Sequence, residues 1–298
     1  MDARIRELLK PDILNTVDGL ELIARIIVEG FMSGSNKSQS VGAGQEFKQY
    51  KNYQAGDDLR QLDWKVFARS ERYYIKQSEI ETNITVKFII DASHSMAYEE
   101  DGLNKLQYAK VMTAALGYLA RKQSDTLGLF TVNDKRIATV QPRFEQQQFI
   151  RFLNELVHLK SEGTWRKGNG MEQLFDHHSK EMILFMTDLY DDAEDLQQFI
   201  AKLKTSRNEV IVFHLMGKHE TDFDFDGSFT FEDLETGVRT KADSLIQRKE
   251  YSQRVQEWLN NSRKWMLEKQ INYQLVFINE SVDIVLRNFL HARKALLR

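Results

Sequence analysis

Short apolar segments alternate with longer amphipathic segments from residue 83 to the end of the chain. In the short segments β-branched and aromatic residues run together, which predicts buried strands. In the longer segments apolar residues recur every three or four positions, which predicts helices. We expect strands at 84–90, 127–132, 136–140, 182–187, 209–215 and 273–278, a hairpin at 229–240, and helices at 104–122, 149–159, 193–206, 245–268 and beyond 278. This order is typical of an α/β fold with a doubly wound, mostly parallel sheet, in which 136–140 forms an antiparallel edge.

The pattern changes before residue 83. Apolar residues in 19–31 fit helical spacing, but the same segment contains a β-branched run at 26–28; of the two structures we favour the helix. We therefore expect two parts: an N-terminal extension of residues 1–82, and an α/β domain of residues 83–298 on which the extension packs.

Composition narrows the function classes. The chain has 298 residues, of which 42 % are hydrophobic and 29 % charged, which is ordinary for a globular protein. It has no cysteine, so disulfides, thiolate zinc sites and cysteine nucleophiles are excluded. The formal charge of -3 shows no excess of basic residues of the kind that binds nucleic acid. Because the N-terminus lacks a signal-peptide core and no run of about 18 apolar residues occurs, we expect a cytoplasmic protein without a transmembrane segment.

Oxygen-bearing side chains gather where predicted strands end. Asp91, Ser93 and Ser95 follow directly on the strand at 84–90, and Asp188 follows the strand at 182–187. Thr164 lies in a polar loop that we expect to reach the same rim of the sheet. Open α/β sheets bind ligands at the carboxyl ends of their strands. Carboxylates and hydroxyls are hard oxygen ligands, which favour Mg²⁺ or Mn²⁺ over zinc.

This set of residues resembles the metal-ion-dependent adhesion site of von Willebrand factor A domains. The shared features are Asp-x-Ser-x-Ser-Met at 91–96, a later Gly-Thr at 163–164 and a strand-end Asp at 188. The resemblance implies that Asp91, Ser93, Ser95, Thr164 and Asp188 surround one divalent cation, some of them through water. Two carboxylates leave a dication little net charge and hydroxyls leave it an open position, so a carboxylate of a partner protein is the natural further ligand. The set thus indicates binding rather than turnover.

Two other interpretations of these residues stay open. Asp91 and the two serines could serve only to cap the following loop and helix, as short polar side chains often do. Alternatively, the chain could be a Mg²⁺-dependent phosphohydrolase in which Asp91 attacks phosphorus. Such enzymes usually carry a second acid two residues further on, where this chain has Ser93.

A second motif precedes the α/β domain. Glu-Phe-x-x-Tyr at 46–50, Gly-Asp-Asp-x-Arg-x-x-Asp-Trp at 56–64 and Ala-Arg at 68–69 resemble the signature of the domain-of-unknown-function 58 family. Members of that family carry a von Willebrand A-like domain and are commonly encoded beside MoxR-type AAA+ ATPases, so the resemblance implies a protein partner from such a system. The signature residues are Gly56, Asp57, Asp58, Arg60, Asp63 and Trp64.

The role of these signature residues has two interpretations. Asp58, Arg60 and Asp63 could form a charge-assisted network that, with Trp64, locks the N-terminal segment onto the sheet. The same residues could instead bind a partner. The sequence as a whole predicts a non-enzymatic adaptor that grips an acidic group on a partner protein through one divalent metal ion.

Overall fold

The computed structural model describes residues 9–35, 47–53, 62–78, 84–134, 138–165, 174–175, 180–190, 193–222, 228–232 and 239–296. The chain divides into two units, one of Met1–Gly34 with Ile84–Arg298 and one of Ser35–Asn83. In the larger unit six strands form one sheet in the order β12-β9-β8-β3-β6-β7. These strands are β3 (Thr85–Asp91), β6 (Thr126–Val132), β7 (Thr139–Arg143), β8 (Glu181–Thr187), β9 (Asn208–Met216) and β12 (Asn272–Phe277).

All neighbouring pairs in this sheet are parallel except β6 and β7, which are antiparallel. The doubly wound, mostly parallel α/β sheet predicted from the sequence is therefore confirmed. Strand β7 lies about three residues later in the chain than we expected. It contains Pro142, which an edge strand tolerates because one side of its backbone forms no ladder.

The order of the strands creates a switch point between β3 and β8. From β3 the chain first adds strands on one side, beginning with β6, and later returns to add β8 on the other side. Crossovers that leave two neighbouring strands in opposite directions open a crevice at their carboxyl ends, where doubly wound proteins bind ligands. Asp91 ends β3 and Asp188 directly follows β8, so both carboxylates stand at this crevice.

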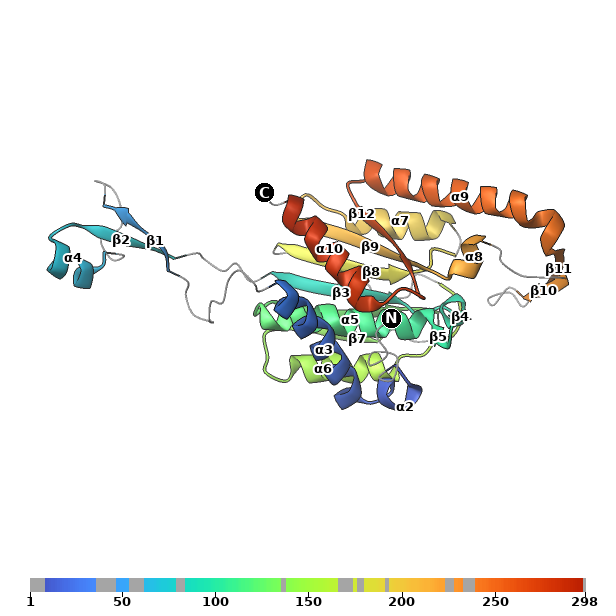
Figure 1. Ribbon diagram of the computed structural model, residues 1–298, viewed down its shortest axis with the longest axis horizontal. Coiled ribbons are helices and arrows are strands. Elements are labelled where there is room, and N and C mark those ends of the chain that lie inside the picture. Colours follow the sequence, from blue (N-terminus) through green and yellow to red (C-terminus); the bar gives the residue numbers. More distant parts are fainter. Residues whose placement is uncertain are drawn as a thin grey trace. The chain divides into compact units, whose positions relative to one another are not determined.

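Helices cover both faces of the sheet and bury two apolar clusters (Figure 1). On one face the cluster includes side chains of α3 (Val17–Ser35), α5 (Lys105–Lys122), α6 (Gln148–His158) and α10 (Val282–Leu296). On the other it includes side chains of α7 (Ala193–Leu203) and α9 (Ser244–Glu268). Shorter elements of this unit are α2 (Pro11–Leu14), η3 (His94–Ala97), β4 (Glu99–Glu100), β5 (Leu103–Asn104), α8 (Lys218–Asp222) and the antiparallel pair β10 (Ser228–Glu232) and β11 (Arg239–Asp243). Within the described residues, no helix is both long and apolar enough to cross a membrane.

Helix α3 belongs to the α/β unit, so the units divide the chain differently from the expected boundary after residue 82. Leu20, Ile23, Ala24, Ile27 and Val28 recur at helical spacing and are at most 3 % exposed. They pack in the same apolar cluster as α5, α6 and α10 on one face of the sheet, and this packing holds residues 9–34 against the later part of the chain. The helix favoured for 19–31 is correct.

The smaller unit pairs β1 (Phe47–Asn52) with β2 (Tyr74–Ser78) in an antiparallel ladder and adds the short helix α4 (Trp64–Ser70). Phe67 of α4 stacks on Tyr73 with ring centroids 4.5 Å apart. Trp64 touches Phe67 edge-on and is 63 % exposed. Within this unit, therefore, Trp64 lies on the surface rather than in an apolar core.

Candidate metal centre

The carboxylate of Asp91 is buried at the end of β3 and held from two sides. Its Oδ1 accepts a hydrogen bond from the backbone N–H of Ser93 at 3.0 Å, and its Oδ2 accepts one from the hydroxyl of Thr187 at 2.8 Å. Thr187 is the last residue of β8, so this second bond spans the crevice between the two strands. The carboxylate is 1 % exposed, and its orientation is fixed before any ligand arrives.

The two serine hydroxyls lie side by side in the loop that follows. Ser93 Oγ and Ser95 Oγ are 3.0 Å apart, and both residues are buried. Ser93 holds the N-cap position of η3 but makes no side-chain capping bond there, and α5 is capped by Asn104 and Gln107 instead. The capping interpretation of Asp91 and the two serines is thus met in part: Asp91 accepts a hydrogen bond from the N–H of Ser93, whereas the Ser93 side chain makes no capping bond.

The loop that carries Thr164 is tied to the Asp91 loop by backbone hydrogen bonds. The N–H of His94 donates to the carbonyl of Gly163 at 2.8 Å, and the N–H of Glu162 donates to the carbonyl of Ala92 at 2.9 Å. Thr164 follows Gly163 directly, so it stands beside the loop of Asp91 and the two serines. The structure thus brings all five predicted residues to one rim of the sheet.

Burial and mutual repulsion make it unfavourable for Asp91 and Asp188 to be charged at the same time. Burial raises the pKa of Asp91 and the nearby charge of Asp188 raises it further, to about 7, although the hydrogen bonds from Ser93 and Thr187 lower it. A carboxyl with such a pKa is half protonated at neutral pH in the absence of another cation. The site therefore favours a positive charge beside Asp91.

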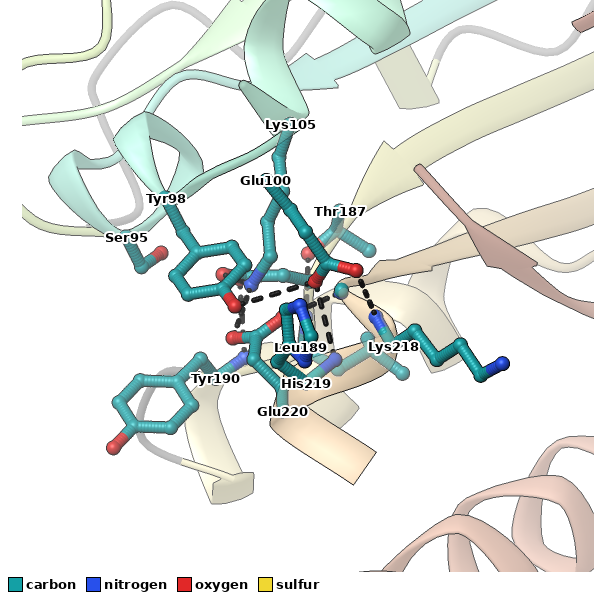
Figure 2. A network of polar contacts seen from close by, with 12 residues as sticks. Ser95, Tyr98, Glu100, Lys105, Thr187, Leu189, Tyr190, Lys218, His219 and Glu220 are labelled. Carbon is teal, nitrogen blue, oxygen red and sulfur yellow. Dashed lines mark hydrogen bonds and ion pairs between the residues drawn. The ribbon is translucent and has the colours of Figure 1, made fainter. Parts of the chain in front are cut away.

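A lysine that the sequence analysis missed supplies a positive charge beside Asp188. Lys105 Nζ lies 3.1 Å from Asp188 Oδ2 and 2.9 Å from Glu220 Oε1, and it stands 5.1 Å from the centre of the Tyr98 ring. Figure 2 shows the side chains of Lys105 and Glu220 meeting from the start of α5 and from helix α8, with the Tyr98 ring beside them. The one signal in the sequence is a lysine at the first position of a helix, where the helix dipole disfavours a cation.

Two glutamates fix the short helix α8 against this cluster. Glu100 accepts hydrogen bonds from the backbone N–H groups of Lys218 and His219, at 3.2 Å and 3.1 Å. Glu220 accepts one from the N–H of Gly217 at 2.6 Å with the oxygen that does not face Lys105. The charged groups of this cluster thus come from β4, α5 and α8 and from the residue that follows β8.

The donor set fits a small, hard cation. A metal–oxygen distance of about 2.1 Å in an octahedron places adjacent ligands about 3.0 Å apart, and the two serine hydroxyls have that separation. Two carboxylates, two serine hydroxyls and a threonine provide oxygen ligands only. In the described part of the chain no cluster of three or more His, Cys, Asp or Glu is placed to hold a metal ion, and the proposed set contains two carboxylates.

The signature residues of the smaller unit are only partly described. Asp63 is the N-cap of α4, and its Oδ1 accepts hydrogen bonds from the N–H groups of Lys65 and Val66 at 2.9 Å and 3.2 Å. Trp64 begins that helix with its ring exposed. The other four, Gly56, Asp57, Asp58 and Arg60, lie outside the described residues. Asp63 therefore has a structural role in starting α4.

Comparisons with known proteins identify relatives of this chain. The family model described as "Protein of unknown function DUF58" matches residues 49–260. An uncharacterized protein of Mycobacterium tuberculosis is 21 % identical over 230 residues, which cover 76 % of this chain and 73 % of that protein.

Solved structures share less sequence. BatB, a conserved hypothetical protein from Bacteroides thetaiotaomicron, is 13 % identical in sequence. The alignment covers 70 % of this chain and 98 % of the BatB chain, with a TM-score of 0.45. The VWA domain of SpRpn10 is 11 % identical, covers 69 % and 94 %, and has a TM-score of 0.38.

Proposed function

The chain belongs to the DUF58 family, and from that premise and the geometry of the site we propose that it is a non-enzymatic adaptor that binds a protein partner through one Mg²⁺ or Mn²⁺ ion. The observation that carries the proposal is the pair Asp91 and Asp188 at the switch point. Both carboxylates are buried, and among the residues that the structure describes a lysine forms an ion pair with Asp188 and none does so with Asp91. A divalent cation at Asp91 would complete the charge balance.

Each residue has a definite task in this proposal. Asp91 would hold the ion with a carboxylate whose two oxygens accept hydrogen bonds from the Ser93 N–H and the Thr187 hydroxyl, which keep it in place. The hydroxyls of Ser93 and Ser95 would be neutral ligands, and Thr164 and Asp188 would complete the shell directly or through water. A Mg²⁺ ion bound there would supply an open position for an oxygen anion from outside. Neutral hydroxyl ligands keep that position attractive to a carboxylate on a partner protein.

The contacts of the site support binding over phosphoryl transfer. A phosphohydrolase would need Asp91 as a free nucleophile and a cation for the phosphate oxygens. Asp91 accepts two hydrogen bonds and has a raised pKa, and the ammonium of Lys105 is held by two carboxylates. We expect no turnover of a panel of phosphate esters with Mg²⁺; hydrolysis that is lost in Asp91→Asn would favour the enzyme.

The partner we propose is a component of a MoxR-type AAA+ ATPase system, in the cytoplasm. Support for this comes from the resemblance of the sequence signature and from membership in the family. The chemistry at the site narrows the contact to an acidic side chain of the partner, because a hard cation with one open position prefers a carboxylate oxygen.

Capture of the partner tests the proposal. The immobilised chain would be incubated with the purified MoxR-type ATPase of the same organism, once with Mg²⁺ and once with EDTA. We expect capture only with Mg²⁺, and loss of capture in Asp91→Ala. Asp195→Ala, which removes an exposed carboxylate from α7, is the matched control and should behave like the wild type. Capture that survives both EDTA and Asp91→Ala would overturn a metal-dependent contact.

A further inference from the structure

Lys105 occupies a position that helix formation does not explain. It is the first residue of α5, and its side chain is 3 % exposed. A cation at a helix N-terminus opposes the helix dipole, and burying an ammonium costs solvation energy. The helix already begins with a full capping box between Asn104 and Gln107. The ammonium itself must therefore be the reason for a lysine here.

That ammonium is enclosed by partners. Asp188 Oδ2 and Glu220 Oε1 lie within 3.1 Å of Nζ, and the Tyr98 ring covers a further side. Two carboxylates within ion-pair distance stabilise the ammonium form of Lys105, and the ion pair occupies Asp188 Oδ2.

The other carboxylate oxygens of the site are engaged as well. Asp188 Oδ1 accepts a hydrogen bond from the N–H of Tyr190 at 3.3 Å. Both oxygens of Asp91 accept hydrogen bonds, from Ser93 and from Thr187. An oxygen that accepts one hydrogen bond still has a lone pair for a metal ion, but the Lys105 ammonium repels a second cation at Asp188 Oδ2, so Asp188 can offer a metal ion only Oδ1.

Ions differ in what they need from carboxylates. Mg²⁺ takes six oxygens at about 2.0–2.1 Å and is satisfied by one or two single carboxylate oxygens together with waters. Ca²⁺ takes six to eight oxygens at about 2.3–2.6 Å and often binds carboxylates through both oxygens. A site whose carboxylates bind only through single oxygens discriminates against the larger ion.

We propose that the ion pair between Lys105 and Asp188 is part of this site. It prevents Asp188 Oδ2 from coordinating the metal, and the site therefore selects small divalent ions over Ca²⁺. The proposal rests on the proposed function, because it assumes a metal ion at Asp91. It adds a positioning residue that acts on the metal through Asp188. Glu220 then has the separate task of balancing the charge of Lys105, which allows the two roles to be separated by mutation.

The test is calorimetric titration of Mg²⁺, Mn²⁺ and Ca²⁺ into the chelator-treated chain. Lys105→Met alone leaves two buried carboxylates without their cation and can fail to fold, so the main variant is Lys105→Met with Glu220→Gln, which removes one charge of each sign. Glu220→Gln alone is the control, because Lys105 still holds Asp188. Circular dichroism and thermal unfolding establish that each variant is folded.

We expect the wild type and Glu220→Gln to bind Mg²⁺ and Mn²⁺ more tightly than Ca²⁺. In the double variant, release of Asp188 Oδ2 should shift the ratio of Ca²⁺ to Mg²⁺ affinity towards Ca²⁺ by about tenfold or more, the size typical of residues that position metal ligands. If the wild type binds Mg²⁺ but the double variant has the same ratio of Ca²⁺ to Mg²⁺ affinity as the wild type, the role of Lys105 is overturned. The proposed function would stand. A wild type that binds none of the three ions would overturn this inference and the proposed function together.

Discussion

Asp91 and Asp188 stand at the ends of neighbouring strands, are equally buried, and have opposite surroundings. Asp188 has the Lys105 ammonium at 3.1 Å, whereas Asp91 is surrounded by hydroxyls and a backbone N–H. The pKa of Asp91 is raised to about 7, by burial first and by Asp188 second. The difference teaches that one carboxylate has a cation of the chain beside it and the other has neutral hydrogen-bond donors, which is the contrast on which the proposed metal ion rests.

The largest expected effect comes from removing the Lys105 cation. Lys105→Met should lower the free energy of unfolding of the metal-free chain by about 3–5 kcal/mol, because Asp188 and Glu220 would be left buried without a counter-charge. Denaturant unfolding with EDTA measures this.

Lys122→Met is the matched control for the lysine change. This lysine forms a partly exposed pair with Glu29 at 3.8 Å, and its loss should cost no more than about 1 kcal/mol. If Lys105→Met lowered the free energy of unfolding by as little as Lys122→Met, the claim that Asp188 depends on a buried cation and Asp91 does not would be wrong.

Adding the missing cation should produce the next largest effect. Mg²⁺ at one hundred times its Kd should stabilise the wild type by about 2.7 kcal/mol, and it should leave Asp91→Asn unchanged because the variant lacks the anionic ligand. Thermal unfolding with Mg²⁺ or EDTA checks this, with Asp195→Asn as a control that keeps the full response. Equal stabilisation of Asp91→Asn would place the ion elsewhere.

The pH dependence of stability should separate the two carboxylates further. The pKa of Asp91 is about 7 in the folded chain and 3.8 ordinarily, so between about pH 4 and pH 7 the folded state keeps a proton that the unfolded state has released. Stability of the metal-free wild type relative to Asp91→Asn should therefore fall as pH rises through this window, by at most about 1.4 kcal/mol per pH unit. Saturating Mg²⁺ should abolish that slope.

The comparison with Asp91→Asn is needed because buried His214 acts in the opposite direction. Burial lowers the pKa of His214 to about 3, so its contribution to stability is complete above about pH 6.5 and is lost as pH falls towards 3. This contribution is present in both proteins and cancels in the difference. A flat difference curve between pH 4 and pH 7 would show that Asp91 ionises like an ordinary carboxylate.

The smallest expected effect concerns a carboxylate that serves structure alone. Asp63→Ala removes the N-cap of α4 and should cost about 1 kcal/mol of local stability, seen as faster hydrogen exchange at Lys65 and Val66. It should leave Mg²⁺ binding unaltered. Loss of Mg²⁺ binding in this variant would mean that the signature of the smaller unit contributes to the metal site.

The sequence predicted the sheet because its strands are continuous apolar runs, and it predicted Asp91 and Asp188 because each follows such a run directly. It did not predict Lys105, because the lysine meets its partners across 83 and 115 residues of sequence, and no local pattern encodes those pairs. It predicted that the N-terminal extension packs on the α/β domain, which α3 does, but it did not predict that residues 35–83 form a unit of their own.

The central claim is that one divalent cation binds beside Asp91, and calorimetric titration of Mg²⁺ into the chelator-treated chain and into Asp91→Ala tests it most directly. The account predicts one ion per chain in the wild type and no binding heat in the variant. Absence of binding of both Mg²⁺ and Mn²⁺ to the wild type, or equal binding to the variant, would contradict it.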